Sequence, residues 1–264
     1  TSKFIDKMAD LDVRIVLAGG ETADVGDIVR TADVGFTAFG RLKRKDLVIN
    51  KIRSGQVIIG FESYGQSTYE TEYNSGIGSN GLTMARHELF HHDYADKYEE
   101  TYAPQIDRKY VYTGKFKVDD NVIIGGRNHP IGKLALSPTR TYLPVLNEIL
   151  KNHKESIHGI IHATGGGHTK VLKYCDAPVH ILKDNLFEVP PIFDIIQKST
   201  DTSLAEMYKV FNMGTRLELY VDAEAAASII EISRRFNIRA RVIGRVEGSK
   251  DNSMSVTVIT NTET

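Results

Sequence analysis

Residues 157–168 read IHGIIHATGGGH and combine a strand pattern with a glycine-rich turn. The first seven residues are rich in isoleucine and suit a buried strand. The three consecutive glycines that follow let the backbone turn sharply and approach a ligand closely. A short helix is expected to continue through Leu172. The order of strand, glycine turn and helix predicts that helices pack against a sheet in layers.

The same alternation continues on both sides of this stretch. Ser137 is expected to cap a helix that begins at Pro138. Residues 64–81 are polar and glycine-rich and predict a loop, whereas residues 91–132 fit no regular pattern and suggest a surface excursion or an oligomer contact. The whole chain predicts an α/β fold of the layered, α+β kind. Strands are expected at Val13–Leu17, Val34–Leu42, Gln56–Phe61, Arg216–Val221, Arg239–Val246 and Ser255–Thr260, and helices at 81–90, 138–151, 192–198, 204–210 and 223–236.

The composition argues against several classes of protein. The chain has 264 residues and a net charge of −1, and its lysines and arginines are scattered, so neither nucleic acid nor an anionic membrane is expected as a partner. A single cysteine, Cys175, rules out an internal disulfide framework. No apolar run approaches the ~18 residues that span a bilayer. We therefore expect a soluble, cytoplasmic protein.

The first candidate ligand site is Gly19-Gly20-Glu21-Thr22-Ala23-Asp24, which follows the first expected strand. Glycines there would let the backbone approach a ligand, and the carboxylates of Glu21 and Asp24 could hold Mg²⁺ or orient a nucleotide phosphate through it. The alternative is a tight turn with solvated acids, which the spacing alone favours.

Two further glycine-rich turns are candidates. Residues 75–81 read SGIGSNG before a helix, and free backbone N–H groups at such a place can cradle a phosphate. No Lys-Ser/Thr pair follows the glycines, so this is not a Walker motif, and a flexible loop with an asparagine cap fits equally well. In the 157–168 stretch, His162 could act as a base, bind metal or contact a phosphate, or it could be an ordinary histidine at a strand end.

His87-Glu88-Leu89-Phe90-His91 matches the pattern of zinc hydrolases, with two histidines on one helix face and a glutamate between them. With nine histidines in the chain, so short a pattern arises readily by chance. A surface helix is the favoured interpretation.

Read in order, these segments resemble the AIR synthetase (phosphoribosylformylglycinamidine cyclo-ligase) family. The similar islands cover nearly the whole chain, and their order is more specific than any one of them. They are Gly19–Asp24, Ser75–Arg86, Leu136–Tyr142, Gly159–Gly167, Glu206–Gly214 and Arg241–Val246.

The resemblance implies a homodimer of two-domain subunits, in which domain A forms part of a β-barrel across the dimer and domain B is α/β. Residues 1–54 would be the C-terminal part of domain A, and residues 55–264 would be domain B with an insertion at about 91–132. The N-terminal half of domain A would be absent, so we do not expect catalysis from this portion alone. One departure is Gly78, which stands where the family has histidine.

The implied reaction is ATP- and Mg²⁺-dependent closure of formylglycinamidine ribonucleotide to 5-aminoimidazole ribonucleotide, through an iminophosphate, in purine biosynthesis. Two alternatives stay open: another ATP-binding enzyme of the same superfamily, or a non-catalytic dimerisation or nucleotide-binding piece. The resemblance implies His162 and Glu21 as catalytic residues, Glu21 as a metal ligand and Arg140 as a ligand of the substrate's ribose phosphate. The expected nucleotide-binding residues, which should share one groove, are Gly19, Gly20, Glu21, Asp24, Ser79, Asn80, Gly81, Thr164, Gly165, Gly166 and Gly167.

Overall fold

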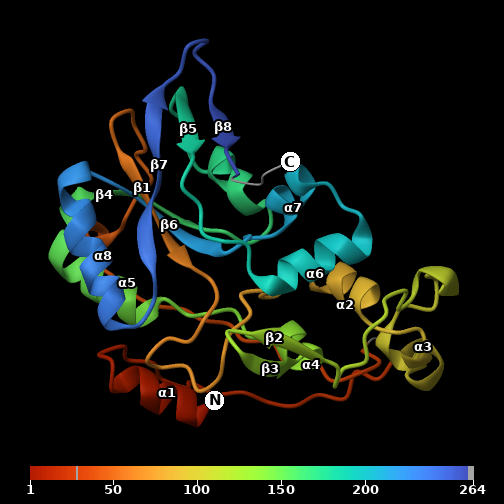
Figure 1. Ribbon diagram of the computed structural model, residues 1–264. Coiled ribbons are helices and arrows are strands. Elements are labelled where there is room, and N and C mark those ends of the chain that lie inside the picture. Colours follow the sequence, from red (N-terminus) through yellow and green to blue (C-terminus); the bar gives the residue numbers. More distant parts are fainter. Residues whose placement is uncertain (28, 261–264) are drawn as a thin grey trace.

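The computed structural model describes residues 1–27 and 29–260, and in them a six-stranded sheet forms the centre of the molecule (Figure 1). The strand order is β4-β6-β1-β7-β5-β8. Neighbouring strands are antiparallel except for β5 and β8, which are parallel. The layered α/β fold is therefore confirmed, with strands β1 Val57–Glu62, β4 Ile157–His162, β5 Val179–Lys183, β6 Thr215–Val221, β7 Ala240–Gly248 and β8 Ser255–Val258.

Helices α5 (Leu143–His153) and α8 (Ala226–Arg235) cover one face of the sheet, on the same side in Figure 1. Their apolar faces pack against Leu217 and Leu219 of β6. Helix α1 (Ser2–Ala9) adds Met8 to the same core. Because every residue of β6 is buried, this strand is enclosed on both faces.

A second core lies beyond the other face, among α2 (Leu82–Leu89), α6 (Pro191–Thr200) and α7 (Leu204–Val210). Residues 91–132 contribute to it, since Val111, Tyr112 and Ile131 are buried there. This segment is therefore part of the packed domain rather than a surface excursion. Its regular elements are α3 Asp93–Lys97, β2 Asn121–Ile124 and β3 Arg127–Pro130, followed by α4 Ile131–Ala135.

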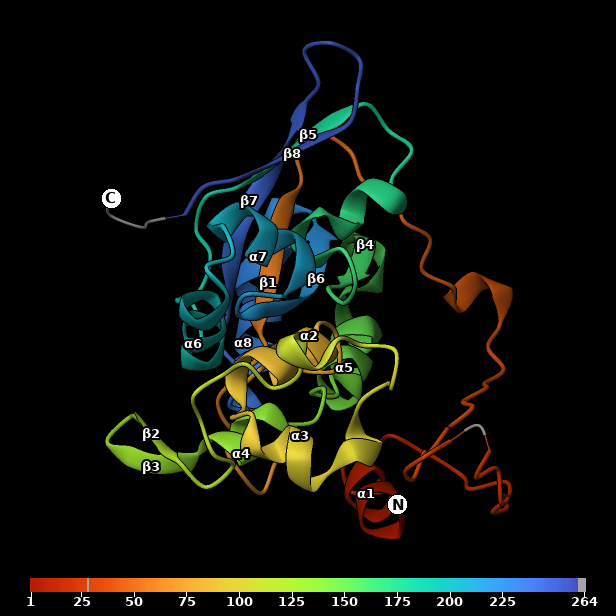
Figure 2. The same ribbon diagram turned by 90° about the vertical axis from the view of Figure 1, so that its right-hand side faces the viewer.

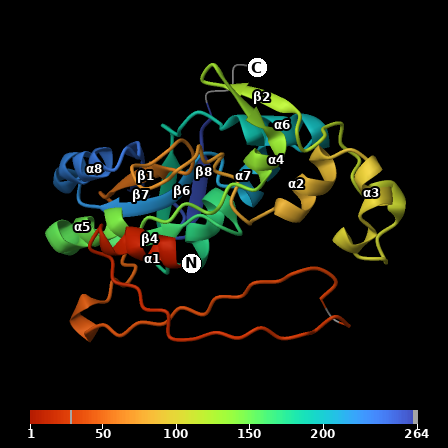
Figure 3. The ribbon, with the colours of Figure 1, turned by 90° about the horizontal axis from the view of Figure 1, so that it is seen from below.

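Two predicted strands are wrong. Val13–Leu17 and Val34–Leu42 are extended chain without strand pairing in the part of the chain that the structure describes. Val34–Leu42 and the end of Val13–Leu17 belong to an arm, residues 16–27 and 29–47, that runs outside the sheet and helices (Figure 3). Figure 2 shows the same arm beside the body. A strand needs a partner to satisfy its backbone N–H and C=O groups, and β-propensity alone supplies none.

The helix predicted from Pro138 begins at Leu143 instead. Ser137 does not cap it, because the Ser137 hydroxyl accepts a hydrogen bond from the Ser75 N–H (3.0 Å). The Pro138 carbonyl accepts one from the Asn74 side chain (2.9 Å). Long-range contacts to the 64–81 loop therefore hold residues 137–142 out of the helix. None of the described helices has the length and apolarity needed to cross a membrane.

Candidate functional site

Two of the three glycine-rich segments meet in the structure. A Cβ atom added at Gly165 would lie 3.3 Å from Asn80 Oδ1, so the 75–81 loop and the 162–168 turn are in contact. At Gly81, which has a φ of +71°, a Cβ would lie 2.5 Å from the Phe211 ring. At Gly167 it would overlap the Tyr208 carbonyl. These glycines are required by close packing as well as by their turns.

The turn after α7 ties the two segments together. The Asn212 side chain donates to the Gly76 carbonyl (2.8 Å). His168, which is fully buried, donates from Nε2 to the Asn212 carbonyl (2.9 Å). Burial, and then the positive charge of Lys183, lower the pKa of His168 to about 3. Neutral His168 is therefore a fixed structural link between the glycine turn and the 75–81 loop.

His162 stands at the end of β4, where its side chain reaches the surface. Its ring meets the Tyr142 ring edge-on, with centroids 6.5 Å apart. Partial desolvation, and then the charges of Arg216 and Lys170, lower the pKa of His162 to about 4. His162 is therefore unprotonated at neutral pH, with one ring nitrogen free to accept a proton. Next to it, Lys170 donates to the Thr164 hydroxyl.

Arg216, at the start of β6, was not among the expected site residues. Its side chain is fully buried and donates from Nη2 to the carbonyls of Gly76 (2.9 Å) and Ile77 (3.1 Å). Any side chain at Gly78 would overlap the Arg216 guanidinium. The signal was present in the sequence, because charged residues are rare in buried strands and Arg216-Leu217-Glu218 places two there.

A second buried charge cluster lies on the same face of β6. The Lys183 ammonium contacts Glu218 Oε1 (2.5 Å) and the His168 carbonyl (2.8 Å). The Tyr220 hydroxyl donates to Glu218 Oε2 (2.9 Å). Both charges of this pair are buried, and each has further hydrogen-bond partners.

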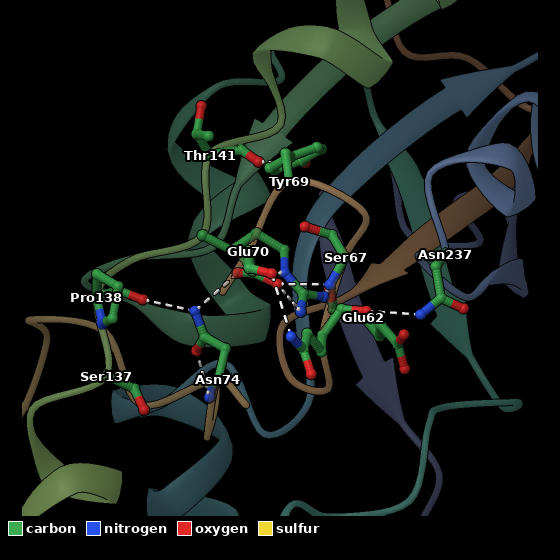
Figure 4. A network of polar contacts seen from close by, with 12 residues as sticks. Glu62, Ser67, Tyr69, Glu70, Asn74, Ser137, Pro138, Thr141 and Asn237 are labelled. Atoms are coloured by element: carbon green, nitrogen blue, oxygen red, sulfur yellow. Dashed lines mark hydrogen bonds and ion pairs between the residues drawn. The ribbon is translucent and has the colours of Figure 1, made fainter. Parts of the chain in front are cut away.

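Arg140 takes part in a polar network between the 62–75 loop and residues 137–141. Figure 4 shows the part of this network around Glu70 and Asn74. The Arg140 guanidinium makes a two-point contact with Glu70 (2.7 and 3.1 Å) and a third bond to the Glu62 carbonyl (3.2 Å). The Asn74 side chain also donates to Glu70 (3.0 Å). Contact between Arg140 and a substrate phosphate would require this pair to open, so the geometry gives Arg140 a structural role.

A pocket of about 680 Å³ lies beside this network, with Arg140 and Ser137 on its wall. Tyr73 and His129 contribute ring surfaces to it, with centroids 4.9 Å apart. Lys133 adds a positive charge that Glu72 partly neutralises at 3.3 Å. The pocket has room for a small organic ligand.

The first glycine segment does not join the other two. Gly19–Asp24 lies on the arm, where all six residues are exposed. A Cβ at Gly19 or Gly20 would meet no atom within 4 Å. The Asp24 carboxylate accepts a hydrogen bond from the nearby Gly26 N–H (3.1 Å). The 75–81 loop and the 162–168 turn are therefore in contact, while Gly19–Asp24 is exposed on the arm, and one groove shared by all three segments stays a prediction.

The zinc-hydrolase pattern gains no support. His87 is buried with Nδ1 accepting from the Tyr112 N–H (3.3 Å), while His91 faces Asp93 (3.2 Å). Among the described residues, no three His, Cys, Asp or Glu side chains come together as a metal site. Glu21 and Asp24 accordingly have no further protein ligand beside them.

Comparison with known proteins agrees with the sequence islands. The family model of the AIR synthase related protein, C-terminal domain, matches residues 53–257. The phosphoribosylformylglycinamidine cyclo-ligase of Methanocaldococcus jannaschii is 31% identical over 239 residues, which is 90% of this chain and 58% of that protein. The enzyme of the same name from Methanococcus vannielii is 34% identical over 88% of this chain and 56% of that protein.

The match extends beyond the archaeal proteins. The phosphoribosylformylglycinamidine cyclo-ligase of Alkaliphilus metalliredigens is 30% identical over 89% of this chain and 59% of that protein. The chain thus spans a little over half the length of the curated relatives that it matches. Because the family model covers most of the chain, including both glycine segments that meet, the chain belongs to the AIR synthase related family through that family's C-terminal domain.

Proposed function

We propose that this chain forms the C-terminal portion of a phosphoribosylformylglycinamidine cyclo-ligase, which closes the imidazole ring of formylglycinamidine ribonucleotide at the expense of ATP. The similarity to enzymes of that name over about 90% of the chain carries the proposal. The contact between the 75–81 loop and the 162–168 turn adds a place where backbone amides and His162 can face one ligand.

ATP, when bound, would supply the phosphoryl group that turns the formyl oxygen of the substrate into a phosphate leaving group. The residues of this chain would hold the substrate and accept one proton from it. Neutral His162 has a ring nitrogen that can accept the proton of the attacking nitrogen as the ring closes. The glycine turn at Thr164–Gly167 brings backbone close to the reacting group, where amides can stabilise developing charge.

The arm carries the two carboxylates that are expected on the metal side of the site. Glu21 and Asp24 would belong to the nucleotide and Mg²⁺ side, and both are exposed on the arm. These two carboxylates would hold Mg²⁺ together with phosphate oxygens and water.

We also propose a homodimer in which the arm is covered. Its apolar side chains are strongly exposed, with Phe36 at 72% and Phe39 at 87%. Exposed apolar patches of this kind commonly mark an interaction surface. A second candidate function, a non-catalytic binding piece, is favoured by the exposure of Glu21 and Asp24 on the arm.

The test compares this chain with the complete protein that its gene encodes. We expect ATP-dependent formation of the imidazole product by the complete protein and none by residues 1–264 alone. Within the complete protein, His162→Ala should lower kcat by roughly 10²–10⁴-fold, the usual contribution of a general base. Product formation that survives His162→Ala removes His162 from the reaction, and absence of turnover in the complete protein refutes the cyclo-ligase assignment. Sedimentation of the complete protein as a monomer would refute the dimer.

A further inference from the structure

The three buried cations of the central region differ in their counter-ions. Arg140 is paired with Glu70, and Lys183 is paired with Glu218. Arg216 makes no ion pair among the described residues, although its side chain is fully buried. Burying a charge without a partner costs several kcal/mol, so such an arrangement calls for an explanation.

The buried carboxylates of the central region pair with other groups, and none of them forms an ion pair with Arg216. Both oxygens of Glu70 serve Arg140, and those of Glu218 serve Lys183 and Tyr220. The Glu62 carboxylate accepts from the backbone N–H and Nε of Arg239 (2.9 and 2.7 Å). A counter-ion for Arg216 would therefore have to come from a bound ligand.

The Arg216 guanidinium also has an N–H donor that makes no hydrogen bond with the described residues. Its Nη2 serves the Gly76 and Ile77 carbonyls, but Nε is buried without any partner among the described residues. A guanidinium carries five N–H donors in a planar fork that matches two oxygens of a phosphate or carboxylate. Unused donors on a buried, uncompensated cation are the feature expected of an anion site.

The position of Arg216 supports the same conclusion. Its backbone carbonyl accepts from the Ala163 N–H (2.6 Å), so it is next to the strand end that carries His162. The field of Arg216 and of Lys170 converges on the His162 ring and disfavours its protonation. Gly78 packs directly on the guanidinium, since a Cβ there would lie 2.3 Å from Nη2. Arg216 thus links the 75–81 loop to the strand end that carries His162, and the charge of Lys170 acts on the same histidine ring.

We infer that Arg216 forms, with Lys170, a binding site for a phosphate-type oxyanion between the 75–81 loop and the 162–170 turn. The inference deepens the proposed function, on which it rests for the identity of the ligand. The phosphate could come from the ribose phosphate of the substrate or from the nucleotide. In either case the anion neutralises Arg216 and places its carrier beside His162.

Calorimetric titration of residues 1–264 with inorganic phosphate tests the site without any turnover. We expect saturable binding that Arg216→Met weakens roughly ten-fold or more, the scale of one charge-assisted contact, and that Arg216→Lys weakens less. The matched control is Arg245→Gln, which removes an equal charge from an exposed arginine of β7. Equal affinity in Arg216→Met and the unchanged protein, or an equal loss in Arg245→Gln, overturns the site.

A second measurement needs no variant. Since Arg216 and Lys170 depress the pKa of His162, an anion bound between them should raise it, as followed by the ring proton shifts in NMR titrations with and without phosphate. An unchanged His162 pKa at saturating phosphate would overturn the placement even if Arg216→Met failed to fold.

The source of the phosphate is separated by parallel titrations with ribose 5-phosphate and with ATP and Mg²⁺. The ligand whose affinity depends on Arg216 is the one that uses the site. Binding that persists while the complete protein lacks cyclo-ligase turnover would refute the proposed function alone. Turnover without any Arg216-dependent phosphate binding would refute this inference alone.

Discussion

Arg216 and Glu218 stand two residues apart on one face of β6, yet their surroundings differ in kind. Glu218 has Lys183 and Tyr220 as partners and forms a closed, neutral cluster. Arg216 has only two backbone carbonyls and no carboxylate among the residues described. The difference teaches that burial alone does not identify a binding site. A buried charge whose partners are all present is structural, and one that lacks a counter-ion is a candidate for a ligand.

The largest expected effect comes from opening the closed cluster. Glu218→Gln leaves Lys183 buried without a counter-ion, and we expect a loss of about 3–5 kcal/mol in the free energy of unfolding. Urea denaturation measures it. Replacing both partners, as Lys183→Met with Glu218→Leu, should recover most of the loss because no charge remains buried. Arg216→Met should cost less than Glu218→Gln, and the reverse order would break the comparison.

The second effect concerns the glycine that covers Arg216. Gly78→Ala introduces a Cβ that overlaps the guanidinium at a φ of +62°, and we expect a loss of about 1–3 kcal/mol in the free energy of unfolding. Gly125→Ala is the matched control, since Gly125 has a φ of +56° and open space around it. Equal costs at the two positions would mean that Arg216 yields freely and is not held in place.

The third effect is a dependence of stability on pH. The pKa values of His162 and His168 in the folded protein, about 4 and about 3, lie below the ordinary value of 6.5. As the pH falls below 6.5 the unfolded chain binds protons that the folded chain does not, so stability declines until the folded pKa values are reached. Fully buried His168 contributes up to about 1.4 kcal/mol per pH unit, and exposed His162 contributes less because solvent screens its charge.

Urea denaturation between pH 8 and pH 4 measures this decline, and His168→Gln should reduce its slope. Above pH 7 both histidines are neutral in both states, and the two proteins should show the same flat dependence. An unaltered slope in His168→Gln would show that buried His168 does not resist protonation.

The smallest expected effect is that of removing an exposed charge. Arg245 is exposed and contacts Asp184 (2.6 Å) and Glu247 (2.7 Å) in water. Because solvent screens such pairs, Arg245→Gln should leave the thermal midpoint unchanged within error. A clear drop in the midpoint would show that exposed pairs matter here as much as the buried ones, and the contrast between Arg216 and Glu218 would lose its basis.

Much of the body could be predicted from local sequence. The strands at Gln56–Phe61 and Arg216–Val221 and the helix at 204–210 were confirmed because their apolar residues recur with the period of the element that they form. The two strands expected in the arm did not form. The residues at 34–42 favour an extended chain, but their side chains cannot provide the neighbouring strand that pairing requires. Strand β5 and the structure within residues 91–132 were missed because their apolar residues are interrupted by charges.

The sequence by itself determined the alternation of strands and helices, the glycine turns at 75–81 and 162–168, and the family. Periodicity and backbone freedom are local properties, and the order of the islands survives as a record of descent. The pairing of charges came from the tertiary fold, in which Glu70 neutralises Arg140, no carboxylate among the described residues pairs with Arg216, and Glu21 is exposed on the arm. Whether a charge is paired depends on side chains that are distant along the chain, such as Glu70 for Arg140. A local sequence pattern does not predict such long-range ion pairs.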